Sequence, residues 1–448
     1  MSNLENYMKQ QAIFCEQNDS ISKNLYSEYG VKRGLRDEKG QGVLTGLTNI
    51  SDIKAFEYHD GVKSPCDGEL SYRGYNIKDL VTGGKGKRFI FEEGAYLLLF
   101  GELPTNTQLM EFQGKLSDCM ELPTDFTRDV IMKAPTSDIM GSMTRSILTL
   151  GSYDKEKESL EIPNVLRQSM QLIAVFPMLA VYAYHAYCHY EKNESMYIHR
   201  PEKDLSIAEN FLRLLRPDTK FTELEARVLD IALLLHMEHG GGNNSTFTTR
   251  VVTSSGSDTY SVISAAMSSL KGKKHGGANL MVMNMMDDIK SHVKDYEDEE
   301  EITSYLSKIL KKEAFDQKGL IYGMGHAVYS ISDPRERVFK GFVEQLAMDK
   351  GREKDMTLYN NIEKIAPKLI AKQRQIFKGV SPNIDFYSGF VYDMLNIPRE
   401  LYTPLFAIAR IAGWSAYRLE ELITTDKIIR PAYKSLVSKK EYIEREER

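Results

Sequence analysis

Three of the nine histidines in the sequence stand beside glycines, where an imidazole can meet a ligand. They are His239 in HMEHGGGNNST, His275 in KKHGGAN and His326 in GMGHAVYSISDPR. A glycine neighbour lets a ligand approach the backbone closely. A single histidine at a helix end is more often a structural hydrogen-bonding group. Three such corners in one chain, one of them followed by Asp-Pro-Arg, predict a ligand site.

Two familiar kinds of site fit these residues poorly. His236 and His239 stand three residues apart, as zinc ligands on a helix could, but the sequence has no HExxH motif and no obvious third ligand. The glycines of GMGHAV do not form the GxGxxG pattern of a dinucleotide-binding turn. We therefore expect no metal ion and no permanently bound cofactor.

An aspartate in an apolar setting adds a second kind of chemistry. Asp385 lies in SPNIDFYSG between Ile384 and Phe386, and Pro382 restrains the turn that leads to it. Apolar neighbours can strip water from a carboxylate, which raises its pKa and suits it to act as a general base. Asp385 could equally be the N-cap of the following helix. The residues alone leave both interpretations open.

The motifs occur in a definite order along the chain. The series HMEHGGGNNST, KKHGGAN, GMGHAVYSISDPR, SPNIDFYSG and ARIAGW resembles that of the citrate synthase family. Fainter similarities, including LSYRGYNIKDL and IIRPAY, extend the resemblance from about Leu70 to Tyr433. Many family members carry an acidic residue directly after the histidine matched by His239, whereas this chain has Gly240. The departure affects the expected shape of that loop and not the set of matched residues.

The resemblance implies an acyltransferase that condenses acetyl-CoA with oxaloacetate and water, giving citrate and CoA. Asp385 would take a proton from the acetyl methyl group. His275 would donate a hydrogen bond to the thioester oxygen, where negative charge develops. His326 would polarise the ketone of oxaloacetate.

The resemblance also assigns residues to the two carboxylates of oxaloacetate and to CoA. Arg335 and Arg410 match carboxylate-binding arginines, and a guanidinium can bind a carboxylate through two hydrogen bonds. His239 matches a further oxaloacetate contact. Arg430 matches an arginine that the family supplies from a partner subunit, which implies a homodimer. The CoA-binding residues implied by the motifs are Lys378, Gly323, Gly325 and Ala327.

Helices are expected to position these residues, and one can be predicted in detail. Thr222 and Glu225 have the spacing of a capping box, which marks a helix N-terminus. Apolar residues at helical spacing follow, and the three glycines from Gly240 should end the helix. His239 would then lie at the C-terminal end of this helix.

Two further helices should flank the second histidine. One is expected from Ser257 or Asp258 to Gly272, and the next begins after Gly277. His275 would precede the N-terminus of the latter helix. The positive end of a helix dipole disfavours imidazolium, so the ring should be a neutral donor.

The family resemblance implies an all-α fold of two domains, with a minor β-hairpin region near the N-terminus. By motif position, residues 1–275 and 390–448 form the large domain, and residues 276–389 form a small CoA-binding domain. Residues 1–70 comprise an N-terminal arm and the hairpin region. Short β-prone runs between turns from Gly40 to Asp79 favour the hairpin.

Composition limits the partners and the compartment. The 448 residues are 42% apolar and 27% charged with a net charge of −5, so no basic excess points to nucleic acid or an anionic membrane. Four scattered cysteines and an N-terminus without a signal-like apolar run favour the cytoplasm. The most apolar stretch, from Leu172 to Tyr187, is too short to span a bilayer and predicts a buried core helix.

Three alternatives to citrate synthesis remain at this stage. A 2-methylcitrate synthase would use propionyl-CoA with the same residues, and one methylene is worth only about 1–3 kcal/mol of discrimination. The chain could also be a catalytically silent CoA-binding relative or a helical scaffold. The intact set of His275, His326 and Asp385 argues against a silent relative.

Overall fold

The computed structural model describes residues 2–83, 87–326, 328–375 and 379–448. The chain divides into two compact units, Met1–Leu47 and Thr48–Arg448. The first unit contains α1 (Asn3–Asp19), α2 (Asn24–Glu28) and a short 3-10 helix, η1 (Arg33–Leu35). A capping box between Ser2 and Glu5 starts α1, and none of the residues of α1 is buried.

A small antiparallel sheet opens the second unit. Its strands are β1 (Ser51–His59), β2 (Val62–Tyr72) and β3 (Tyr75–Asn76), in that order. The β1–β2 turn is Asp60-Gly61 with both φ angles positive, the conformation that favours Asp-Gly in a two-residue hairpin. The predicted hairpin region is confirmed.

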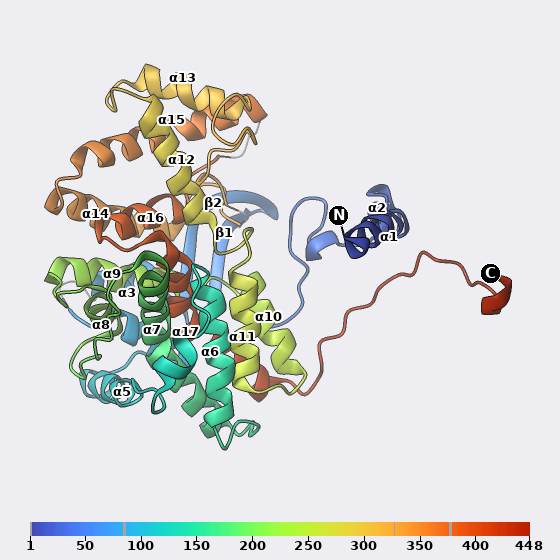
Figure 1. Cartoon of the computed structure of the whole chain (residues 1–448). Helices are drawn as coiled ribbons and strands as arrows, with labels where there is room; N and C mark the ends of the chain where they lie inside the picture. The colour runs from blue at the N-terminus through green and yellow to red at the C-terminus, as the bar shows by residue number, and fades with distance from the viewer. Residues whose placement is uncertain (1, 84–86, 327, 376–378) are drawn as a thin grey trace. The chain divides into compact units, whose positions relative to one another are not determined.

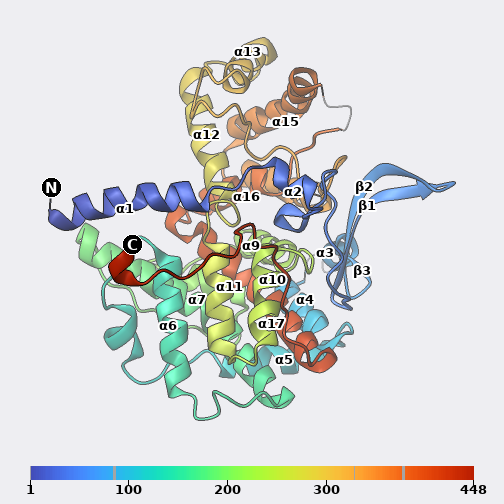
Figure 2. The ribbon, with the colours of Figure 1, turned by 90° about the vertical axis from the view of Figure 1, so that its right-hand side faces the viewer.

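Helices make up most of the rest of the second unit, which confirms the predicted all-α class. One group is α3 (Ile77–Gly83), α4 (Ile90–Phe100), α5 (Asn106–Asp118), the π-helix η2 (Thr127–Ile131), α6 (Ile139–Tyr153), α7 (Ile162–Lys192), α8 (Ile207–Leu215), α9 (Glu223–His236), α10 (Asn244–Ser254), α11 (Thr259–Leu270) and α17 (Tyr402–Thr424). A second group is α12 (Ala278–His292), α13 (Glu299–Leu310), α14 (Pro334–Asp349), α15 (Glu353–Arg374) and α16 (Asp385–Met394). Figures 1 and 2 show the second group gathered above the first.

Two long helices form the centre of the larger group. α17 is buried along most of its length and packs against α4, α7, α9 and α10. Among the described residues, α7 is the one helix long and apolar enough to cross a membrane, but 78% of its most apolar window is buried inside the protein. This burial is typical of a core helix, as predicted for that stretch.

The helices around the histidines begin where the sequence predicts. Thr222 caps α9 with a complete capping box to Glu225. Asp258 caps α11, and Gly277 precedes the first residue of α12. His275 therefore lies just before a helix N-terminus.

The predicted C-terminal end of α9, at His239, is wrong by three residues. The helix ends at His236, and Gly240, with φ +91°, lies beyond it. The His236 carbonyl accepts a hydrogen bond from Nε of Arg410 at 2.7 Å. The Glu238 carboxylate accepts the Gly240 N–H at 3.1 Å. These bonds to side chains replace the last helical turn, so His239 lies in the loop that follows.

The predicted domain boundaries near residues 276 and 389 stay a prediction. The two helix groups belong to one compact unit from Thr48 to Arg448. α14 packs against α15 and α16 of its own group and also against α9 and β2 of the other. This helix therefore joins the two groups. Residues just before it contribute to the candidate active site described below.

Candidate active site

Asp333 organises the start of α14. This buried carboxylate caps the helix by accepting the Arg335 N–H at 2.9 Å. It also accepts Nε and Nη2 of Arg335 at 3.2 and 3.0 Å, and the Ile384 N–H at 3.1 Å. Burial alone would raise the pKa of Asp333, but the Arg335 guanidinium lowers it, so the carboxylate is ionised. One side chain thus joins Arg335 to the segment that leads into Asp385.

Asp385 is the first residue of α16 and does not cap that helix. The Asn383 side chain accepts the Asp385 N–H at 3.0 Å, so the N-cap interpretation of Asp385 is excluded. Burial raises the pKa of Asp385 to about 6; Arg335 opposes the rise and Asp333 adds to it. A carboxylate with this pKa can accept a proton near neutral pH.

His326 is held in one tautomer by the backbone that follows it. Its Nδ1 accepts the N–H groups of Val328 at 2.9 Å and Tyr329 at 3.3 Å. A neutral ring with an accepting Nδ1 carries its proton on Nε2. His326 is therefore oriented as a hydrogen-bond donor through Nε2.

His239 lies against His326 although 87 positions separate them in the sequence. Their ring centroids are 5.1 Å apart, and Nε2 of His239 is 3.0 Å from the hydroxyl of Tyr329. Burial, reinforced by Arg335, holds the pKa of His239 well below its ordinary value. Both substrate histidines predicted from the motifs thus occupy one place, with His239 neutral.

His275 is partly buried against the first turn of α10. The Ser245 N–H, near the N-terminus of α10, points to Nε2 of His275 at 3.4 Å, and the Ser245 hydroxyl lies 2.9 Å from the same nitrogen. Trp414 of α17 donates to that hydroxyl at 3.2 Å. Burial lowers the pKa of His275 to about 4, and the positive charge of Arg410 adds to this effect, so the ring is neutral. Because Nε2 accepts from the backbone, the proton lies on Nδ1.

Arg410 brings a fully buried guanidinium to these histidines from α17. Its Nε donates to the His236 carbonyl, and its guanidinium lies 4.7 Å from the ring centre of Phe406. Among the described residues, Nη1 of Arg410 has no hydrogen-bond partner. Burial lowers the pKa of Arg410 to about 10, which still leaves it charged at neutral pH. An unsatisfied buried cation of this kind suits a carboxylate ligand.

A cavity of about 270 Å³ opens beside His326. Gly325 and His326 line one wall, and Arg374 of α15 lines another. The Gly325 N–H donates to the Ser381 carbonyl at 2.7 Å, and the Asn383 N–H donates to the Gly323 carbonyl at 2.9 Å. These bonds hold the segment from Gly323 to Gly325 against the turn before Asp385. Gly323 and Gly325 both have positive φ, where a side chain would be strained.

One predicted binding residue, Arg430, is not brought into this cluster, and two others have no described position. Lys378 and Ala327 lie outside the described residues. Arg430 is exposed in the segment after α17. Its expected contact with a partner subunit stays a prediction.

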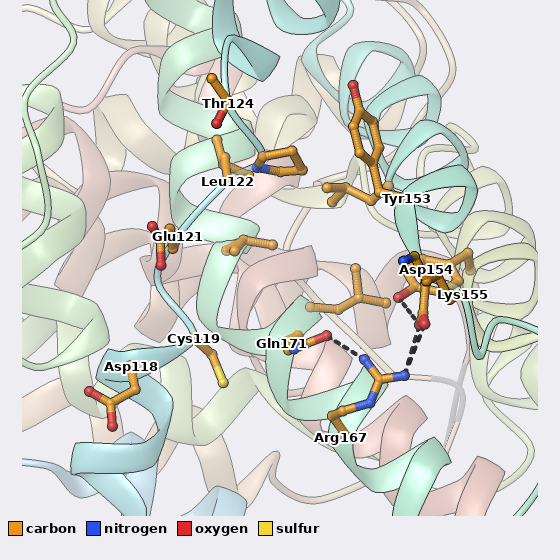
Figure 3. A pocket seen from close by; sticks show the side chains of 15 residues that line it. Asp118, Cys119, Glu121, Leu122, Thr124, Tyr153, Asp154, Lys155, Arg167 and Gln171 are labelled. Atoms are coloured by element: carbon orange, nitrogen blue, oxygen red, sulfur yellow. Dashed lines mark hydrogen bonds and ion pairs between the residues drawn. The ribbon is translucent and has the colours of Figure 1, made fainter.

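A larger cavity than the one beside His326 lies elsewhere. It has a volume of about 520 Å³ and is lined from α5, α6, α7 and α11, with none of the predicted site residues among its walls. Figure 3 shows Arg167 in this cavity with hydrogen bonds to Asp154 and Gln171. Size alone would therefore have misplaced the site.

Several functional residues were missed by sequence reasoning. Asp333 stands in the DPR motif and Tyr329 six residues before Arg335, so motif proximity was the available signal for both. Ser245 lies in the HMEHGGGNNST motif and had the same signal, whereas Arg374 lies in none of the matched motifs. In the described part of the chain no three His, Cys, Asp or Glu side chains are grouped to hold a metal ion.

Comparisons with known proteins match this arrangement. Residues 38–432 match a family model described as citrate synthase, C-terminal domain. A citrate synthase of Synechocystis is 36% identical over 392 residues, covering 86% of this chain and 89% of that protein. A 2-methylcitrate synthase of Shewanella oneidensis is 34% identical over 364 residues, covering 81% and 87%.

Solved structures give the same result. A citrate synthase of Thermoplasma acidophilum, in a ternary complex with carboxymethyl coenzyme A and oxaloacetate, aligns with a TM-score of 0.75 at 26% identity. The alignment covers 93% of this chain and 99% of that one. The citrate synthase of Pyrobaculum aerophilum aligns with a TM-score of 0.72 at 28% identity, covering 92% and 95%.

Proposed function

The chain belongs to the citrate synthase family of acyltransferases, and we propose that it condenses acetyl-CoA with oxaloacetate and water to give citrate and CoA. One observation carries the proposal. Two neutral histidines with defined tautomers, a carboxylate with a raised pKa and two buried arginines come from distant segments to one place.

In the first step Asp385 removes a proton from the acetyl methyl group. The pKa of Asp385, raised to about 6, brings the base closer to the weak carbon acid while leaving it ionised at neutral pH. Nδ1–H of neutral His275 donates a hydrogen bond to the thioester oxygen as the enolate forms. A neutral donor suits this role because the helix N-terminal N–H at Nε2 keeps the second proton off the ring.

In the second step the enolate carbon attacks the ketone of oxaloacetate. Nε2–H of His326 polarises the ketone oxygen, and His239 contacts the same substrate. Nη1 of Arg410 and the part of the Arg335 guanidinium that does not contact Asp333 bind the two carboxylates of oxaloacetate. Asp333 supports this geometry because it fixes Arg335 and the backbone before Asp385 with a single carboxylate. Water then hydrolyses the thioester of the condensed product.

CoA is a co-substrate in this proposal. The cavity beside His326 adjoins the reacting groups, and Arg374 gives it a positive charge suited to a phosphate. Gly323 and Gly325 allow close approach of the ligand to the backbone. Lys378 and Ala327, which the family motifs assign to CoA, complete the set we propose.

The proposal includes a homodimer in the cytoplasm. The motif IIRPAY assigns Arg430 to the active site of the partner subunit, where it would bind a carboxylate of oxaloacetate. Its exposed position in a single chain is compatible with such a role. Arg430→Ala should raise the KM for oxaloacetate, and sedimentation should give a dimer.

The second candidate is 2-methylcitrate synthesis from propionyl-CoA. It is favoured by the Shewanella relative, whose identity of 34% is nearly that of the Synechocystis citrate synthase. Both reactions would use the same base and the same donors. They differ by one methylene in the acyl pocket.

The test is release of the CoA thiol by purified protein with oxaloacetate and either acyl donor. Greater kcat/KM with acetyl-CoA would support citrate synthesis, and greater kcat/KM with propionyl-CoA would move the assignment to 2-methylcitrate. Release without oxaloacetate would indicate simple thioester hydrolysis. No release from a folded dimer with either donor would overturn the enzymatic proposal.

A further inference from the structure

Tyr329 lies against both of the histidines assigned to oxaloacetate. Its ring centroid is 4.6 Å from that of His326 and 5.5 Å from that of His239. The side chain is 3% exposed. None of the roles derived above requires a tyrosine at this position.

The backbone of Tyr329 acts on His326. Its N–H, with that of Val328, donates to Nδ1 of His326. This contact requires only a peptide group at position 329. The His326 tautomer should therefore survive a change of the side chain.

The side chain of Tyr329 acts on His239. The two polar atoms, the phenol oxygen and Nε2, are 3.0 Å apart. A phenol is a good donor and a neutral imidazole nitrogen a good acceptor, so O–H to Nε2 is the stronger of the two possible bonds. It also uses the hydroxyl proton, which would otherwise be buried without a partner. Burial raises the pKa of Tyr329, which keeps that proton on the phenol.

A glycine on β2 allows Tyr329 to reach this position. A Cβ atom on Gly68 would lie 2.6 Å from Cδ1 of Tyr329 and 2.4 Å from the Ser332 carbonyl oxygen. The Gly68 N–H also donates to the Ser332 hydroxyl at 3.1 Å. The hairpin therefore packs directly on the loop that carries Tyr329 and limits how far its ring can turn.

We propose that Tyr329 is a positioning residue that gives the two oxaloacetate histidines opposite tautomers. Its backbone N–H places the proton of His326 on Nε2, and its hydroxyl places the proton of His239 on Nδ1. Both rings then present an N–H to an electron-rich substrate such as oxaloacetate. This inference rests on the proposed function and adds a residue that selects the donor atoms of the site.

The test is Tyr329→Phe, which removes one oxygen and keeps the ring. The kcat/KM for oxaloacetate should fall about ten- to hundredfold, because His239 loses the partner that fixes its proton. The KM for acetyl-CoA should change less than twofold. Calorimetric titration with oxaloacetate alone should show a matching loss of affinity.

Tyr305→Phe is the matched control. Tyr305 of α13 is also buried, and its hydroxyl donates to Asp288, away from the site residues. Thermal unfolding should show similar small losses for both variants, while only Tyr329→Phe changes the oxaloacetate parameters. Equal kinetics in Tyr329→Phe and wild type would overturn the proposal.

A second measurement separates this inference from the proposed reaction. In ¹⁵N spectra of histidine-labelled protein, assigned with His239→Gln, Nε2 of His239 should resonate as an acceptor in the wild type and change in Tyr329→Phe. If the wild type shows no turnover, the proposed function fails and this spectrum alone decides the tautomer. A protonated Nε2 of His239 in the wild type would overturn the inference in either case.

Discussion

Two partly buried aspartates in this protein have opposite environments. Asp154, in the large cavity of Figure 3, accepts hydrogen bonds from Tyr260 at 2.7 Å, Arg167 at 3.0 Å and Gln168 at 3.1 Å. In the described residues no side chain donates a hydrogen bond to the carboxylate of Asp385. Burial alone would raise the pKa of Asp154, but its donors lower it, whereas burial raises that of Asp385. Depth of burial and hydrogen-bond partners together decide whether a carboxylate is a structural anion or a base.

Two buried arginines on α17 repeat the contrast. Arg418 donates to Thr259, Thr253 and the Ser257 carbonyl at 3.0–3.2 Å. Within the described residues, Arg410 donates to the His236 carbonyl and its Nη1 has no hydrogen-bond partner. The guanidinium of Arg418 has its hydrogen bonds satisfied by neighbouring segments, whereas that of Arg410 has, in the described part of the chain, a free donor that suits a ligand.

Replacing the base should give the largest effect. Asp385→Asn should lower kcat about 10²- to 10⁴-fold in the thiol-release assay, because no carboxylate remains to take the methyl proton. Since the folded pKa is above the unfolded value, ionisation at pH 8 destabilises the folded state. Asparagine avoids this cost, so urea unfolding at pH 8 should show about 1–3 kcal/mol more stability. Retained activity would contradict the role of Asp385.

The paired arginines offer the next test. Arg410→Lys should raise the KM for oxaloacetate about ten- to hundredfold, because lysine cannot reproduce the guanidinium fork. Arg418→Lys should leave that KM unchanged and lower the melting temperature more than Arg410→Lys does. The reverse pattern in kinetics and thermal unfolding would refute the distinction between the two arginines.

The pH dependence of the wild type should reflect the raised pKa of Asp385. Below about pH 6 the kcat/KM for acetyl-CoA should fall about tenfold per pH unit, because the base becomes protonated. His275 should add no limb in this range, since its pKa is lowered to about 4. A kcat/KM for acetyl-CoA that stays constant from pH 7 down to pH 4.5 would be incompatible with this assignment.

The smallest kinetic effect is expected at Asp154. Asp154→Asn should leave kcat and KM unchanged and lower the free energy of unfolding at pH 7 by about 1–3 kcal/mol, because Arg167 loses its charged partner. The folded pKa lies below the unfolded one, so this contribution is present above the unfolded pKa and is lost as the pH falls through the folded value. Urea unfolding at pH 7 and pH 3 would measure it. A kinetic defect would instead connect this cavity with the reaction.

Local sequence was sufficient for several elements. The Thr222–Glu225 capping box predicted the start of α9, and Asp60-Gly61 has the residues that a tight hairpin turn requires. These features depend on residues within four positions of one another, so neighbouring side chains encode them. The ordered motifs also identified the family and the residues grouped in the site.

Other features depend on contacts between distant segments. The end of α9 follows from Arg410, 174 residues away, and Asp333 accepts from Ile384, 51 residues away. For Asp385 the sequence left base and N-cap open, because the answer depended on the Asn383 side chain and on burial. Tyr329 stands in the GMGHAVYSISDPR motif, but its contact with His239 depends on packing between distant segments. Hydrogen bonds and desolvation are set by what packs around a group, and for these groups folding supplies the neighbours.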